Sequence, residues 1–115
     1  MIEYKRYQGF PVSRIEEDLR AQGYEPVHDE DQPGFVYEPH SHAEANIIVV
    51  LSGEMEVKVG DLAGILHSGD KVTFPANVVH SSHIGSEGCE YLWMESRANV
   101  SSNTPGIYLR PERNT

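Results

Sequence analysis

The sequence predicts an all-β barrel or sandwich. Turn-forming residues recur about every eight to ten positions from Pro33 onward, and short runs rich in branched or aromatic residues lie between them. In one run, Met55, Val57 and Val59 alternate with charged residues, which is the pattern of a strand with one buried face. Many short strands beside a single short helix indicate a barrel or a sandwich.

The chain begins with a short predicted strand. Residues 2–8 alternate loosely, with Ile2 and Tyr4 on one face, before the break at Gly9-Phe10-Pro11. The open edge of such a strand can pair with another subunit. We therefore expect that the protein can form a homodimer.

A short helix is predicted over residues 14–22. Ser13 and Glu16 match a capping box, and an apolar stripe runs along one face at four-residue spacing. Gly23 stands where a left-handed residue would end the helix. We expect this helix to form a lid on the barrel or to lie against its flank.

The rest of the chain divides into turns and strands. The polar stretch 29–34 is predicted to be an exposed, turn-rich loop. The predicted strands are 46–51, 54–59, 62–67, 71–74, 78–84 and 89–95. The tail, residues 98–115, carries two prolines and several small polar residues and is predicted to be irregular.

At 115 residues the chain is long enough for one core. We therefore expect a single domain over residues 1–115, with the barrel core at about 25–97 and the N-terminal strand and helix at 2–23.

Charge and composition exclude several classes of function. The net charge of -9, from 18 acidic and 9 basic residues, disfavours nucleic acid and anionic membranes as partners. The longest apolar run, residues 47–51, is far shorter than the roughly 20 residues of a membrane-spanning helix. With one cysteine, Cys89, no internal disulfide can form, and we expect a cytoplasmic protein without a leader sequence.

Three histidines have the spacing of metal ligands. His40 and His42 are two residues apart and point to one side if the segment is extended. His80 follows a strand that Pro75 ends. Asn46 would lie about 13 Å beyond His42 in a straight strand. A turn through residues 43–45 would bring Asn46 back to the same site and leave Glu44, a weaker candidate ligand, at the tip.

Two longer motifs resemble a known family. They are Gly34-x5-His40-x-His42-x3-Asn46-x6-Gly53 and Gly69-x5-Pro75-x-Asn77-x2-His80-x3-Ile84. Their order and spacing are similar to the two motifs of the cupins, and the chain is identified as a small single-domain cupin of the RmlC-like superfamily. The resemblance implies a double-stranded β-helix, or jelly roll, with one short N-terminal helix. It also implies a divalent transition metal held by His40, His42 and His80.

Three positions depart from the cupin pattern. Asn77 replaces a glycine, and asparagine tolerates a left-handed turn. Ile84 replaces an asparagine. Asn46 stands where cupins usually place a glutamate ligand, and its amide offers only a neutral oxygen. We expect Asn46 to be a weak fourth ligand or a hydrogen-bond partner of a ligand.

The ligand set suits some metals better than others. Three neutral imidazoles suit Fe, Ni, Zn or Cu better than magnesium or calcium. Mn is a further candidate ion. Open coordination positions would remain for a small organic molecule or dioxygen.

Other candidates have ordinary structural roles or line the pocket. We expect His28, His67 and His83 to be hydrogen-bonded structural residues, and Cys89 to be a small buried residue. Residues 89–95 place Cys89, Tyr91, Trp93 and Glu95 on one strand face. The predicted pocket residues are Tyr91, Trp93, Ile48 and Phe74.

Three functions fit this sequence. The first is a three-histidine iron dioxygenase, which the resemblance implies because some cupin dioxygenases lack the glutamate. The second is a binding or sensing protein that recognises a small molecule without turnover. The third is a metal-assisted isomerase or lyase acting on a sugar or keto acid, with Glu44, Glu95 or His83 as the base.

Overall fold

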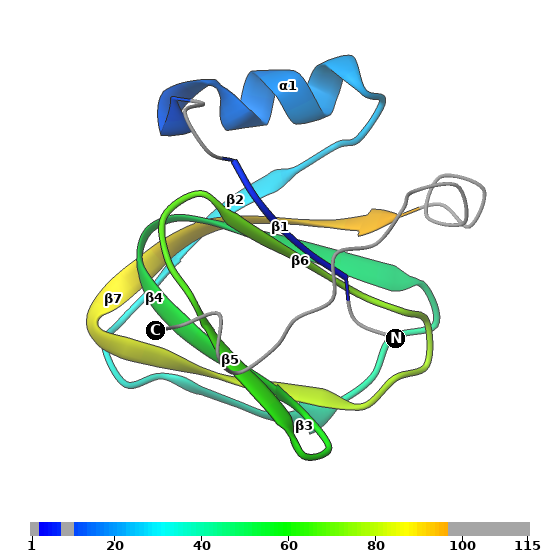
Figure 1. The fold of residues 1–115 in the computed structure, drawn as a ribbon, viewed down its shortest axis with the longest axis vertical. Coiled ribbons are helices and arrows are strands. Elements are labelled where there is room, and N and C mark those ends of the chain that lie inside the picture. The colour runs from blue at the N-terminus through cyan, green and yellow to red at the C-terminus, as the bar shows by residue number, and fades with distance from the viewer. Residues whose placement is uncertain (1–2, 8–10, 97–115) are drawn as a thin grey trace.

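The chain forms an antiparallel β-sheet that curls into a barrel, with a short helix on its outside (Figure 1). The computed structural model describes residues 3–7 and 11–96. The strands are β1 (Glu3–Arg6), β2 (Val27–Asp31), β3 (Val36–His40), β4 (Ala45–Val59), β5 (Leu62–Leu66), β6 (Asp70–Phe74) and β7 (His80–Ser96). The predicted all-β fold is confirmed as a double-stranded β-helix with one short N-terminal helix. The tail 98–115, Ile2 and Gln8 lie outside the described residues.

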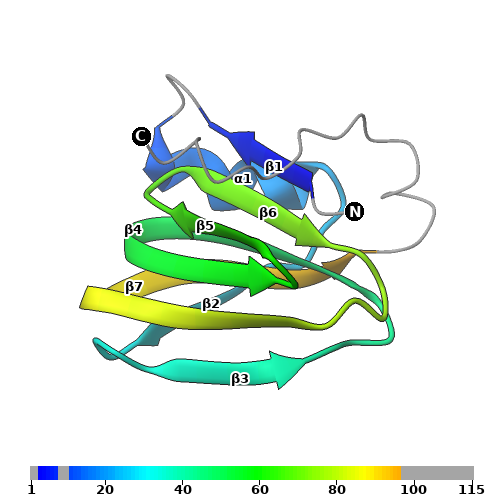
Figure 2. The ribbon, with the colours of Figure 1, turned by 60° about the horizontal axis from the view of Figure 1, so that its bottom comes forward.

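Strands β4 and β7 form the centre of the sheet. The strand order is β1-β6-β4-β7-β2, and β3 and β5 pair with β7 and β4, respectively. Figure 2 shows β3 below β7 at one end of the barrel, with β1 and α1 at the other end. This topology brings β3, β4 and β7 to neighbouring positions; these strands carry His40, Asn46 and His80, and His42 lies in the turn between β3 and β4.

The helix begins differently from the prediction and ends as predicted. A 3₁₀ turn, η1 (Val12–Arg14), leads into α1 (Ile15–Ala21). The predicted capping box is wrong, because Ser13 lies within the 3₁₀ turn and no side chain caps α1. Gly23 ends the helix with a φ of 98°, and its amide donates to the carbonyl of Arg20 at 3.0 Å.

The curled sheet has an apolar layer on each side. Inside the barrel lie the buried residues Tyr4, Ile48, Val50, Met55, Val57, Leu66, Val72, Phe74, Ile84, Cys89 and Tyr91. Outside, α1 packs on the sheet through Ile15, Leu19, Ile47, Val49, Leu92 and Met94. Residues 47–50 therefore form an unbroken apolar run because the helix covers the outer face of β4. Within residues 3–7 and 11–96, no helix has the length and apolar character needed to cross a membrane.

Two predicted turns are wrong, because they lie inside long strands. Gly53 lies within β4 and Gly88 within β7, where we expected loops. The β4–β7 register shifts between Gly53 and Met55, which is a bulge. Both glycines have positive φ, and a Cβ at Gly53 would lie only 2.1 Å from the carbonyl oxygen of Gly88. The missing side chain of Gly53 permits the backbones of β4 and β7 to approach closely while both strands continue, whereas a Cβ at Gly88 would lie 3.0 Å from the carbonyl oxygen of Asp31.

The predicted exposed loop at residues 29–34 is also wrong in its first half. Residues 27–31 form β2, which pairs with β7. Asp29 lies opposite Tyr91, and Asp31 lies opposite Cys89. The polar composition of β2 concealed a strand whose carboxylates accept hydrogen bonds from aromatic side chains of the barrel.

An ion pair attaches the N-terminal strand to the barrel. Asp70 is fully buried and accepts hydrogen bonds from Tyr4 Oη at 2.7 Å and Arg6 Nε at 2.8 Å. The backbone amide of His67 donates to the other carboxylate oxygen at 2.8 Å. A buried carboxylate needs such partners, so these contacts fix β1 beside β6.

Candidate metal centre

Three histidine rings converge at one end of the barrel. His40 ends β3, His42 follows it, and His80 begins β7 directly opposite His40. One ring nitrogen from each residue lies within 4.8 Å of the other two. The ring centroids are 4.6 to 5.3 Å apart. The three predicted ligands are therefore close enough to bind a single ion.

Backbone contacts orient two of these rings. His40 Nδ1 lies 2.6 Å from the carbonyl oxygen of Glu38, and His80 Nδ1 lies 3.0 Å from that of Val78. A carbonyl oxygen only accepts, so each Nδ1 carries the hydrogen and donates it. Each Nε2 then keeps its lone pair, as a metal ligand requires.

The Nε2 atoms of His42 and His80 are buried and have no hydrogen-bond partner among the described residues. A buried polar atom without a partner costs about 1–3 kcal/mol. A metal ion at this point would satisfy both nitrogens. The donor set therefore fits a transition metal on the geometry of the protein itself.

The surroundings of His80 favour its neutral form. Burial lowers the pKa of His80, the hydrogen bond to Val78 opposes this, and the charges of His40 and His42 lower the pKa further. The side chain is 4% exposed and stacks on Phe74, with ring centroids 4.1 Å apart and planes inclined by 7°. Phe74 thus holds the ring in place while His80 remains neutral and able to donate its lone pair.

The turn after His42 returns the chain to the site. The backbone bends at residues 43–44, and β4 begins at Ala45. The carbonyl of His42 accepts a hydrogen bond from the amide of Asn77 at 2.7 Å, and Asn77 takes the expected left-handed conformation with a φ of 65°. Asn46 lines the same cavity as the histidines, whereas Glu44 is exposed and outside their cluster.

The histidines open into a cavity of about 310 Å³. All four residues proposed as pocket lining, Tyr91, Trp93, Ile48 and Phe74, lie on its wall. The other lining residues are Asp29, Tyr37, His40, His42, Asn46, Met55, His80, Ser82 and Glu95. Sequence reasoning missed Asp29, Tyr37, Met55 and Ser82 as wall residues. Met55 could have been found from its alternation in β4, but no sequence signal pointed to Tyr37.

Two tyrosines and an aspartate form a hydrogen-bonded group beside the histidines. Tyr37 and Tyr91 donate to Asp31 Oδ2 at 2.6 and 2.7 Å, and the two hydroxyl oxygens are 3.0 Å apart. Burial raises the pKa of Tyr91, and the hydrogen bonds with Tyr37 and Asp31 raise it further. Burial and then the bond to Asp31 raise the pKa of Tyr37 as well. Both phenols therefore stay protonated and present polar oxygens to the cavity.

The raised pKa of Tyr91 predicts that the contribution of this residue to stability depends on pH. The folded chain holds the phenol proton more tightly than the unfolded chain, in which tyrosine titrates near pH 10. The contribution is complete below pH 10 and declines above it by up to about 1.4 kcal/mol per pH unit. Urea unfolding of wild type and Tyr91→Phe at pH 8, 10 and 11 measures it. The difference in the free energy of unfolding between the two proteins should shrink from pH 10 to 11. A constant difference would contradict a raised pKa of Tyr91 in the folded chain.

The remaining histidines and the cysteine lie outside the cluster. His28 contacts Glu90, and His67 lies 3.2 Å from Glu54. His83 is exposed and does not line the metal cavity. Cys89 is buried, and burial raises the pKa of its thiol to about 12, so the thiolate is disfavoured.

Comparisons with known proteins show the family and support the fold. A family model described as "Cupin domain" matches residues 27–95. A cupin-2 domain protein of Shewanella frigidimarina is 21% identical, with a TM-score of 0.56 over 64% of this chain and 71% of its own. KdgF from a Halomonas species is 20% identical, with a TM-score of 0.55 over 87% of this chain and 84% of its own. At these identities the solved structures support the fold alone. A search of curated proteins finds no match.

Proposed function

The chain belongs to the cupin domain family, and we propose that it binds one divalent transition metal through Nε2 of His40, His42 and His80. The observation that carries the proposal is the pair of buried Nε2 atoms, on His42 and His80, that have no hydrogen-bond partner in the described part of the chain and lie beside a third imidazole. The proposed metals are Fe, Ni, Zn, Mn and Cu. When bound, such an ion supplies Lewis acidity and open coordination positions, and iron also supplies redox chemistry with dioxygen.

Asn46 sets this site apart from a cupin site with a glutamate ligand. We propose that its amide is a weak fourth ligand or a hydrogen-bond partner of the ligands. Its partner across the strands is Glu95, which lines the same cavity but lies outside the histidine cluster. A carboxylate is thus available to the bound molecule instead of to the metal.

The cavity supports a ligand beside the histidines. Ile48, Phe74 and Trp93 supply apolar wall, and the Tyr37 and Tyr91 hydroxyls supply polar contacts. Pockets of this kind bind small organic molecules. We propose that such a molecule binds here and that Tyr37 orients it by hydrogen bonding. The homodimer and the cytoplasmic location stay predictions.

Two reactions are proposed for this site. The first is oxidation by dioxygen at a three-histidine iron centre, supported by the neutral ligand set. The second is metal-assisted isomerisation or elimination, supported by Glu95, the only one of the three candidate bases that lines the cavity. Glu95 would accept a proton from the bound molecule. Binding without turnover is the remaining alternative.

Metal-dependent stability tests the proposed function. At a free metal concentration 100 times the Kd, binding stabilises the fold by about 2.7 kcal/mol, so the Tm should rise by several degrees and fall again with chelator. The titration should be run anaerobically with Fe²⁺ and in air with Ni²⁺, Zn²⁺, Mn²⁺ and Cu²⁺. Oxygen uptake by the iron form with small thiols or dicarbonyls would favour the dioxygenase, whereas oxygen-independent turnover would favour the isomerase. An unchanged Tm with all five metals would contradict metal binding.

A further inference from the structure

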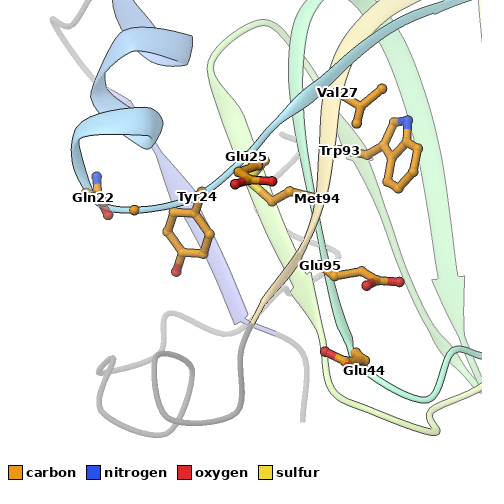
Figure 3. Close-up of a pocket in the computed structure, with 9 residues that line it drawn as sticks. Gln22, Tyr24, Glu25, Val27, Glu44, Trp93, Met94 and Glu95 are labelled. Atoms are coloured by element: carbon orange, nitrogen blue, oxygen red, sulfur yellow. The ribbon is translucent and has the colours of Figure 1, made fainter.

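A second cavity adjoins the metal cavity. It has a volume of about 350 Å³ and lies between the C-terminal end of α1 and the last residues of β7 (Figure 3). Its lining residues are Gln22, Gly23, Tyr24, Glu25, Val27, Glu44, Trp93, Met94 and Glu95. Trp93 and Glu95 line both cavities. A molecule bound at the histidines could therefore contact these two residues with its far end.

The two cavities are acidic. Carboxylates line the metal cavity at Asp29 and Glu95, and the second cavity at Glu25, Glu44 and Glu95. Among residues 3–7 and 11–96, no lysine or arginine lines either cavity. An anionic group beyond the metal would meet only like charges here, whereas a cationic group would meet opposite ones. The net charge of -9 adds long-range attraction for cations.

Glu95 and Trp93 are arranged to receive an ammonium group. Trp93 Nε1 donates to Asp29 Oδ2 at 3.1 Å, which holds the indole ring in the cavity wall. An indole face attracts cations. Glu44 precedes β4 next to the Asn46–Glu95 pair, so it lies near Glu95 at the junction of the two cavities. Figure 3 shows Glu44 and Glu95 near each other on the wall of the second cavity, with Trp93 further along β7 beside Val27.

We infer that the ligand of this protein is a small amine with a metal-binding donor atom at one end and an ammonium group at the other. The donor faces the histidines, where His80 is 96% buried with its Nε2 unpartnered among the described residues. The ammonium group binds Glu95, with Glu44 adding a second carboxylate. This assignment rests on the proposed metal site. It disfavours the keto acids that the sequence left open.

Three small thiols, whose far ends are cationic, neutral and anionic, test whether the protein prefers a ligand with an ammonium group. The full chain is loaded with Co²⁺, and 2-aminoethanethiol, 2-mercaptoethanol and 3-mercaptopropionate are titrated at pH 7. A thiolate bound to Co²⁺ gives a charge-transfer band that reports each Kd. The aminothiol should bind most tightly and the carboxylate most weakly, at least about 10-fold apart, because a charge-assisted hydrogen bond contributes about 1.5–3 kcal/mol.

The three thiols differ in the pKa of the thiol group, which also affects their Kd values. The decisive quantity is therefore the ratio of the Kd in Glu95→Gln to the Kd in wild type for each thiol, because the thiol pKa is the same in both measurements. This variant should weaken the aminothiol about 10-fold or more and leave 2-mercaptoethanol unchanged. Glu44→Gln should have a smaller effect in the same direction. Asp61→Asn makes the same charge change at an exposed turn outside both cavities and should change none of the three Kd values.

The outcomes separate the two proposals. If Co²⁺ binds but Glu95→Gln does not weaken the aminothiol, or none of the thiols binds, the amine assignment is overturned and the metal site stands. An effect of Asp61→Asn equal to that of Glu95→Gln would also overturn it, because selection would then come from overall charge. If Co²⁺ itself does not bind, both the proposed metal site and the proposed amine ligand are contradicted.

Discussion

Replacing His80 with glutamine is expected to weaken metal binding by more than about 100-fold. Loss of a residue that merely orients a ligand costs 10–100-fold in metal affinity, and His80→Gln removes a ligand itself. The glutamine keeps much of the volume packed against Phe74, so the fold should be retained. Competition for Co²⁺ with a chromophoric chelator measures the affinity, and circular dichroism checks the fold.

A second ligand variant and a matched control make this result specific. His42→Ala, at a partly exposed ring, should lose affinity to a similar extent with little effect on the core. His83→Gln changes an exposed histidine three residues from His80 and should keep wild-type affinity. Wild-type affinity in folded His80→Gln and His42→Ala would show that the metal binds elsewhere or not at all.

Replacing Gly53 with alanine is expected to destabilise the fold by about 2–6 kcal/mol. The φ of 80° strains a residue with a side chain, at about 1–3 kcal/mol. The new Cβ would also lie 2.1 Å from the carbonyl oxygen of Gly88, so β4 and β7 must separate or shift, which adds about 1–3 kcal/mol. Urea unfolding measures the change in the free energy of unfolding.

Gly60→Ala is the control for this substitution. Gly60 also has a positive φ, of 58°, but a Cβ there meets no atom of residues 3–7 and 11–96 within 4 Å. It should cost only about 1 kcal/mol, the ordinary penalty for a left-handed residue. Equal losses in the two variants would mean that backbone conformation, and not the contact between β4 and β7, makes Gly53 necessary.

His40 and His42 could be placed together from sequence because their spacing is local, whereas His80 was assigned to the site through the resemblance of its motif to the second cupin motif. His40 and His42 are separated by one residue, and the turn that returns Asn46 to the site follows from the length of an extended chain. The alternation in residues 89–95 likewise placed Tyr91 and Trp93 on the inner face correctly. These inferences need only the two-residue period of a strand.

Other wall residues could not be placed because the strands are irregular. Tyr37 and His40 both line the cavity although they are three residues apart, since the β3–β7 register shifts between them. No simple period predicts that arrangement. The acidic strand β2 was taken for a loop because Asp29 and Asp31 point toward barrel aromatics, which hydrophobic patterning does not anticipate.

The glycines were misread for a related reason. Gly53 and Gly88 have the composition of turns, yet both lie inside strands. The missing side chain of Gly53 lets the backbone of β7 lie close to β4, whereas that of Gly88 leaves room for Asp31 of β2. Glycine marks positive φ or close approach, and only the partner strand shows which applies. A sequence alone cannot show that Gly53 lies against the backbone of Gly88.

Elemental analysis tests the metal site most directly. The chain should be purified without added metal, chelator or histidine tag, beside His80→Gln prepared in the same way. The proposed site predicts about one Fe, Ni, Zn, Mn or Cu ion per wild-type chain and almost none in the variant. Equal metal content in the two proteins, or none in wild type even after incubation with these ions, would contradict it.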